Sequence, residues 1–194
     1  SSDLTWNRHI DKIVAKANST LGLLRRNLKT HRRDLKERAY KTLVRPKVEY
    51  CSTIWDPHTK KNTDQLEMVQ RRGARYVCNR YHNTSSVSDM LEELGWDTLK
   101  HRRAASRMCI MYKIVHGLVA IPSSHILEPT TKVTRTDHPY KFIPITTTKN
   151  YYTYSYFPRS IGQWNGLPPS VVMAPSYDSF KEAVMAVDFT AIKH

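Results

Sequence analysis

The fold class follows from residues 6–28, which read WNRHIDKIVAKANSTLGLLRRNL. Apolar residues recur along this stretch at intervals of three or four positions: Trp6, Ile10, Ile13, Ala17, Leu21, Leu24 and Leu28. Because an α-helix completes a turn in about 3.6 residues, this spacing predicts one long amphipathic helix. The far side of that helix carries basic side chains: Arg8, Lys12, Lys16 and Arg26.

The same periodicity continues toward the middle of the chain. It predicts further helices over residues 33–44, 63–78, 86–94 and 97–116. Pro46 is expected to bend or end the second helix, because proline lacks a backbone N–H. Ser86 is expected to cap a helix at its N-terminus, and Gly95 and Gly117 are expected to end helices.

The composition changes after residue 117. Eight of the ten prolines fall between Pro122 and Pro175. Residues 142–145 and 151–157 are aromatic and β-branched, which predicts short strands and a hairpin across residues 147–150. Residues 158–164 are expected to form a turn of helix, and Ser176 is expected to cap a final helix. The sequence therefore predicts a mainly α protein, with a helical bundle over residues 1–117 and a small mixed α/β, Pro-rich extension over residues 118–194.

The charge excess points to a polyanionic partner. The chain has 31 Lys and Arg against 17 Asp and Glu, for a net charge of +14. Residues 1–117 hold 24 of the basic and 12 of the acidic residues. An excess of this size favours nucleic acid or an anionic membrane surface as the partner.

Several protein classes are excluded. No apolar run approaches the roughly 18 residues that a spanning helix needs, and residues 1–8 contain no signal-peptide core. The three cysteines, Cys51, Cys78 and Cys109, form no CxxC pair. This pattern predicts a reducing, intracellular compartment without a disulfide framework, and it sets aside the secreted, collagenous and membrane-spanning classes.

The candidate site consists of arginines and lysines on predicted helices. Arg71, Arg72 and Arg75 share one side of a helix whose other side is apolar. There are three further arginine doublets: Arg25-Arg26, Arg32-Arg33 and Arg102-Arg103. Cations held on rigid supports are what a phosphate backbone requires, and arginine adds bidentate geometry. The predicted nucleic-acid-binding residues are Lys12, Lys16, Arg25, Arg26, Arg71, Arg72, Arg75, Arg102 and Arg103. The first half of the helix over residues 97–116, which holds the last two, is expected to face solvent or a partner.

No catalytic constellation is recognisable. The sequence has no GxGxxG, no GxxxxGK[ST] and no HExxH motif, and its histidines show no zinc spacing. The adjacent acidic pair Glu92-Glu93 is interpreted as a solvated helix face. We therefore predict no catalytic residue, no metal ligand and no cofactor in this chain.

A series of short motifs, in order along nearly the whole chain, resembles the C-terminal end of the reverse transcriptase polyprotein of non-LTR (LINE-type) retrotransposons, with jockey and chicken-repeat clades most similar. The motifs cover residues 21–28, 39–46, 49–50, 55–57, 66–75, 85–87, 94–96, 111–117, 156–159, 164–165, 167–168 and 180–181. Each is weak alone, but their order and spacing are specific. Gly73 departs from the family pattern, where alanine is common, and glycine inside a helix costs about 0.5–1 kcal/mol.

The resemblance implies one part of an enzyme. The family's metal-binding aspartates, which would hold Mg²⁺, lie in a palm domain upstream of the matched region. The matched region corresponds to the thumb and a downstream extension, which grip the template–primer duplex of RNA and DNA. It implies that the chain alone is inactive as an RNA-directed DNA polymerase, that its partners are nucleic acid and the remainder of the polyprotein, and that it is found in the nucleus and cytoplasm.

Two other functions remain open on the sequence. The chain could be a protein-interaction module, in which the apolar residues 108–115 and the aromatic tail dock on the palm or on a second copy. It could also be a fragment adopted by the host for another role.

Overall fold

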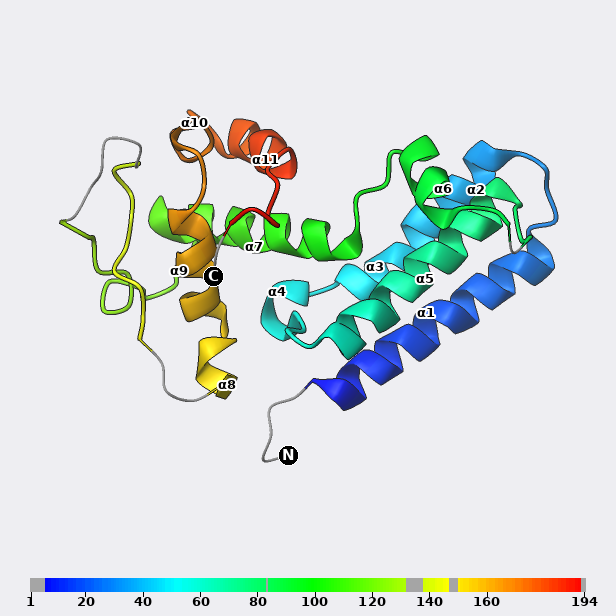
Figure 1. Ribbon diagram of the computed structural model, residues 1–194, viewed down its shortest axis with the longest axis horizontal. Coiled ribbons are helices and arrows are strands. Elements are labelled where there is room, and N and C mark those ends of the chain that lie inside the picture. Colours follow the sequence, from blue (N-terminus) through cyan, green and yellow to red (C-terminus); the bar gives the residue numbers. More distant parts are fainter. Residues whose placement is uncertain (1–5, 83, 132–137, 147–149, 193–194) are drawn as a thin grey trace. The chain divides into compact units, whose positions relative to one another are not determined.

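The computed structural model describes residues 6–82, 84–131, 138–146 and 150–192, and these residues are mainly helical (Figure 1). They fall into two compact units that divide between Lys100 and His101. We call residues 6–100 the N-terminal unit and residues 101–192 the C-terminal unit. The division lies before the boundary expected near residue 117, because Leu99 joins one hydrophobic core and Ala104 already belongs to another.

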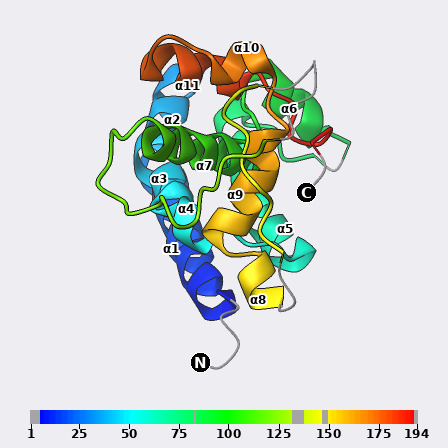
Figure 2. The ribbon, with the colours of Figure 1, turned by 90° about the vertical axis from the view of Figure 1, so that its left-hand side faces the viewer.

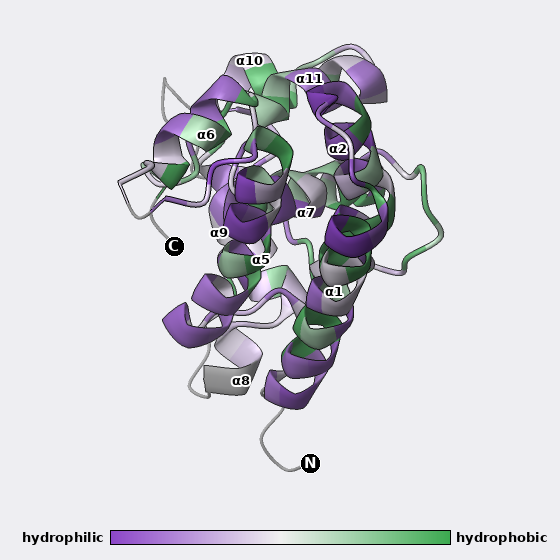
Figure 3. Cartoon of the chain, turned by 90° about the vertical axis from the view of Figure 1, so that its right-hand side faces the viewer, coloured by the Kyte–Doolittle hydropathy of each residue, from purple (hydrophilic) through white to green (hydrophobic). Residues whose placement is uncertain are grey.

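The N-terminal unit is built around two long helices. Its elements are α1 (Asn7–Asn27), α2 (Arg33–Ala39), the π-helical turn η1 (Tyr40–Val44), α3 (Arg45–Glu49), α4 (Ser52–Trp55), α5 (Lys60–Cys78) and α6 (Val87–Glu93). The apolar stripe predicted on α1 is confirmed, with Ile10, Ala17, Leu21 and Leu24 buried. The alternation of hydrophilic and hydrophobic turns along α1 is visible in Figure 3. The α2–η1–α3 segment packs against α1 and α5 and closes the core.

Side-chain hydrogen bonds between α1 and α5 show that the two helices run parallel. Asn62 donates to Asn7 at 2.7 Å, near the start of both helices. Further along, Arg72 donates to the side-chain oxygen of Asn18 at 3.0 Å. Because partners advance together along both helices, their C-terminal ends lie at the same end of the pair.

Of the two outcomes predicted for Pro46, a bend or an end, the structure does not show an end of the second helix. The helix instead widens into η1, where the N–H of Arg45 donates to the carbonyl of Tyr40. This π-type register accommodates a residue that has no N–H to donate and whose ring clashes with an ordinary helical turn. Pro46 then occupies the first turn of α3, where proline is tolerated.

The predicted helix ends in this region are confirmed. The Ser86 hydroxyl accepts from the backbone N–H of Asp89 at 3.2 Å, and Gly95 follows α6 with a φ of +60°. The start of α7 is capped by a residue distant in sequence. The Glu67 carboxylate accepts from the backbone N–H groups of Leu99 and Lys100 at 3.2 and 2.7 Å.

The C-terminal unit surrounds most of α7 (Leu99–Val115) with α8 (Asn150–Thr153), α9 (Tyr156–Asn165), α10 (Pro169–Val172) and α11 (Tyr177–Met185). Figure 2 shows α9 crossing α7, with α10 and α11 on another side. The core contains Met108, Ile161, Trp164 and Phe180, each 0% exposed. Within the described ranges, no helix is both long and apolar enough to cross a membrane.

The strands predicted for the extension are wrong for residues 150–157, which form α8 and the start of α9. Tyr152 and Tyr154 are exposed, so this aromatic run does not supply the buried face of a strand. The segment is helical because a helix places Ile161 and Trp164 in the core. Pro158 lies in the first turn of α9, where proline is tolerated. In the described part of the extension, the only pairing is an isolated bridge between Pro129 and Phe142. The hairpin residues 147–149 lie outside the described residues.

The final helix matches its prediction. The Ser176 hydroxyl accepts from the N–H of Ser179 at 3.2 Å and thereby caps α11. Phe180 and Val184 on this helix are buried, as the spacing predicted.

Candidate nucleic-acid interface

Seven of the nine predicted binding residues lie on the two parallel helices of the N-terminal unit. Four come from α1 and three from α5: Lys12, Lys16, Arg25, Arg26, Arg71, Arg72 and Arg75. All are exposed except Arg75, which is half-buried.

The packing of α1 against α5 places these cations on two neighbouring parallel helices. Both helices turn their apolar stripes toward the same core, and polar pairs such as Arg72 with Asn18 fill the seam between them. Lys12, Lys16 and Arg26 lie on α1 away from its buried stripe, and Arg71 and Arg75 lie on α5 away from its own. We call these seven cations of the two helices the basic face. From Lys12 to Arg26 it extends roughly 20 Å along the helix axis at 1.5 Å per residue.

The basic face has no internal compensation. Within the described ranges, none of its seven cations forms an ion pair. Five cations elsewhere in the same unit are paired: Arg32 with Asp34, Arg33 and Arg80 with Glu93, Lys41 with Glu37, and Arg45 with Glu49. A rigid row of uncompensated cations attracts a polyanion at long range and can contact its phosphates directly.

Arg102 and Arg103 belong to the C-terminal unit and are not part of the basic face. Arg103 is 1% exposed, which corrects its assignment as a surface contact. Arg107, on the same half of α7, is 2% exposed and donates to the side-chain oxygen of Gln163 at 2.5 and 3.2 Å. The expectation that this half of α7 faces solvent or a partner is therefore wrong for Arg103 and Arg107, whereas Lys100 is exposed and Arg102 is half-buried.

The apolar half of α7 is covered in the same way. Met108 and Met111 are 0% exposed, and the hydroxyl of Tyr112 donates to the carbonyl of Ala174 at 3.3 Å. These residues fill the core of their own unit and do not form the exposed docking patch that the protein-interaction alternative required.

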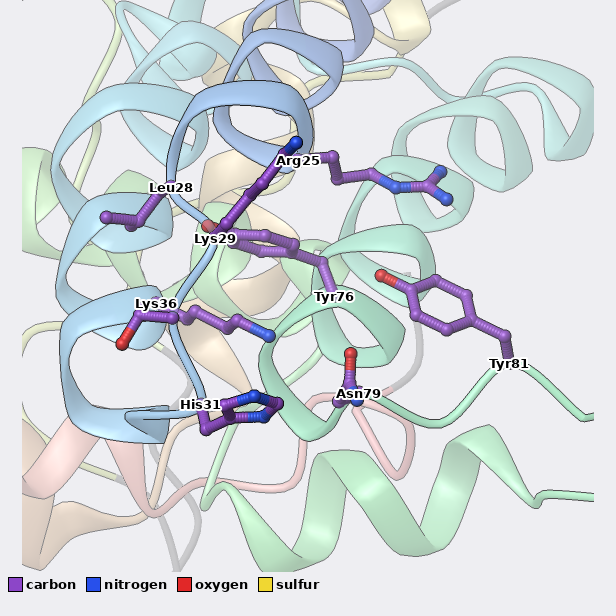
Figure 4. A pocket seen from close by; sticks show the side chains of 9 residues that line it. Arg25, Leu28, Lys29, His31, Lys36, Tyr76, Asn79 and Tyr81 are labelled. Atoms are coloured by element: carbon purple, nitrogen blue, oxygen red, sulfur yellow. The ribbon is translucent and has the colours of Figure 1, made fainter.

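A basic pocket that was not predicted from the sequence lies where α1 and α5 end (Figure 4). Its volume is about 330 Å³. Its lining residues are Arg25, Leu28, Lys29, Thr30, His31, Lys36, Tyr76, Asn79 and Tyr81. Only Arg25 was among the predicted site residues. The dense basic run RRNLKTHRR over residues 25–33 is the sequence signal that marks this region.

Several acidic residues of the described chain serve structural contacts. Glu93 accepts from Arg33 and, at 2.8 Å, from Arg80, so it ties α6 to the start of α2 and to the segment after α5. Hydrogen bonds from Arg33 hold the pKa of Glu93 below its ordinary value. Among the residues that the structure describes, no group of three His, Cys, Asp or Glu side chains is placed to hold a metal ion. No protein-family model, curated protein or solved structure shows significant similarity to the chain.

Proposed function

We propose that the chain binds the template–primer duplex as the thumb-like part of an RNA-directed DNA polymerase of the non-LTR retrotransposon type. The observation that carries the proposal is the basic face, in which seven cations on two parallel helices lack carboxylate partners. The family resemblance of the sequence supports the same reading. The role is binding, with the chemistry performed by a palm domain.

The physical basis of binding is the release of counterions from the phosphate backbone. Each phosphate that a cation neutralises adds about 0.9 to the steepness with which log affinity falls with log salt on duplex DNA. Because these cations are held on helices, binding of the phosphates does not carry the entropy cost of ordering a flexible basic tail. Binding of this kind is insensitive to base sequence, which suits a surface that must follow any template.

The test is fluorescence anisotropy of a labelled RNA–DNA hybrid, titrated with the protein across a salt series. We expect a steep salt dependence for the natural chain. The triple variant R71A/R72A/R75A should weaken binding to every sequence alike and reduce the salt slope by about 1 for each lost phosphate contact.

A matched control removes three exposed cations that lie off the basic face, in the variant R38A/K47A/K181A. It has the same net charge as the first variant, so an equal loss would indicate only a general charge effect. A shallow dependence of log affinity on log salt for the natural chain would contradict the proposal. Unchanged affinity in a folded R71A/R72A/R75A variant would contradict it as well.

A further inference from the structure

The pocket at the C-terminal ends of α1 and α5 is lined by basic and hydrogen-bonding side chains and by no carboxylate. Arg25 reaches it from the last turn of α1, Lys29 and His31 from the segment between α1 and α2, and Lys36 from α2. Figure 4 shows Lys36 extending across the pocket, with its ammonium end toward His31 and Asn79. A cavity of about 330 Å³ has the size of a small-ligand site.

Lys36 is the residue that most needs a partner. It is 6% exposed, and lysine is almost never buried to this extent unless it is paired. In the described structure its ammonium forms no ion pair and lies 5.3 Å from the centroid of the Tyr76 ring. A cation–π contact offsets only part of the desolvation of an ammonium group. An anion in the pocket would supply the missing charge.

Tyr76 adds an unused donor. The residue is 2% exposed, and its hydroxyl has no hydrogen-bond partner among the described residues. Burial raises the pKa of Tyr76, so its hydroxyl remains protonated and able to donate. Near it, the Arg25 guanidinium lies 5.0 Å from the centroid of the half-exposed Tyr81 ring, which leaves a ring available for stacking.

Helix dipoles alone do not explain this arrangement. The C-terminal ends of α1 and α5 each carry roughly half a negative charge, which would attract about one cation in total. The pocket holds three permanent cations, Arg25, Lys29 and Lys36, which leaves an excess of about two positive charges. A phosphomonoester carries about −1.5 to −2 at neutral pH, whereas an internal phosphodiester carries only a single charge.

We propose that this pocket binds a terminal phosphate of a nucleic-acid strand that lies along the basic face. The inference rests on the proposed function, which supplies the nucleic-acid strand. The group that the pocket recognises is a phosphomonoester. Arg25 belongs to both the basic face and the pocket, so a strand that follows the basic face reaches the pocket at the ends of α1 and α5. Lys36 binds the phosphate, Tyr76 donates to it, and Tyr81 stacks on the terminal base.

The experiment compares the affinities of oligonucleotides identical in sequence that end in a 5′-phosphate, a 3′-phosphate or hydroxyl groups. We expect the oligonucleotide with one of the two phosphorylated ends to bind about tenfold more tightly than the oligonucleotide that ends in hydroxyl groups. Hydrogen bonds to a charged group contribute an affinity gain of about this size. The variant K36M keeps the buried stem and removes the charge. It should abolish this preference while leaving binding of the hydroxyl-ended strand unchanged.

Two further variants keep the test decisive. K47M changes an exposed lysine on α3 outside the pocket and should retain the preference. Y76F removes only the hydroxyl and should reduce the preference; it serves as the main variant if K36M does not fold. Thermal melting by circular dichroism reports folding, and K36M should melt no lower than the natural chain, because it removes a buried charge.

The outcomes separate the two proposals. Equal affinity for all three ends, with a steep salt slope, overturns the pocket and leaves the basic face standing. Stabilisation of the chain by inorganic phosphate that K36M abolishes, without oligonucleotide binding, overturns the proposed function and assigns the pocket to a free phosphate compound. A preference that survives K36M and Y76F in folded protein overturns the pocket assignment.

Discussion

Gly73 lies in the middle of α5 with the ring of Tyr40 directly against it. A Cβ atom at this position would lie 2.3 Å from Cε2 of Tyr40, closer than any real contact. Tyr40 is fully buried and stacks on Trp96, with ring centroids 4.6 Å apart. Close packing between η1 and α5 therefore explains why glycine occupies this position.

This packing predicts that Gly73→Ala destabilises the protein, although alanine is the better helix former. Alanine gains about 1 kcal/mol of helix propensity, whereas overpacking a buried ring costs roughly 1–3 kcal/mol or more. We expect a lower Tm in a calorimetric or circular dichroism melt. The control is the same change in a Tyr40→Leu background, where alanine should be neutral or stabilising because the ring is gone. A Gly73→Ala chain that melts higher than the natural one would contradict this account.

At the scale of elements, Glu93 joins three segments through two arginines. Its carboxylate accepts from Arg33 at the start of α2 and from Arg80 after α5, while Glu93 itself belongs to α6. The hydrogen bond from Arg33 and the charges of both arginines lower the pKa of Glu93 from its ordinary value of 4.5. The ion pairs therefore require the ionised carboxylate.

Since the folded pKa is depressed, the stability that Glu93 contributes is present above pH 4.5 and is lost as the pH falls through the lowered pKa. Glu93→Gln should lower the Tm at neutral pH, and the gap from the natural chain should close as the pH falls below 4.5 through the lowered pKa. The neighbouring variant Glu92→Gln removes an exposed carboxylate that makes no ion pair among the described residues, so its effect should be small. A Glu93→Gln deficit that persists unchanged in acid would contradict the ion-pair explanation.

Elements also show how local and distant signals compete. Ser86 and Ser176 cap α6 and α11 as predicted, because a cap is made with residues two or three positions away. The start of α7 depends instead on Glu67, which lies on α5 and has no local signature. The aromatic run before α9 has strand propensity, yet it becomes helical because propensity is weaker than burial of Trp164.

At the scale of the whole molecule, the chain has two hydrophobic cores, each closed by residues of its own unit. Phe180 is fully buried in one of them, beside Tyr112 and Trp164 at centroid distances of 4.5 and 5.9 Å. Val69 is fully buried in the other. Separate cores predict that damage to one unit remains local.

Hydrogen exchange measures this directly. Phe180→Leu, which costs on the order of 1–2 kcal/mol, should speed amide exchange in α9 and α11 while α1 and α5 keep their protection. Val69→Ala should speed amide exchange in α1 and α5, while α9 and α11 keep their protection. Equal loss of protection in both units from either variant would show that they unfold as one.

The sequence by itself determined where most helices lie, how several of them end and that the charge is concentrated before residue 117. These features depend on neighbours a few positions apart, so the helical period and the capping residues specify them locally. Eight of the nine cations predicted to bind nucleic acid are exposed or half-buried, and Arg103 is buried.

Only the tertiary structure decided which of those cations lie on neighbouring helices. The parallel packing of α1 on α5 assembles seven of them, whereas the C-terminal unit packs around α7 and removes Arg103 from the surface. The pocket arises for the same reason, since Lys29, Lys36 and Tyr76 meet only where the ends of two helices coincide. Helical period fixes which face of a helix a residue occupies, but burial and charge pairing depend on which other helix covers that face.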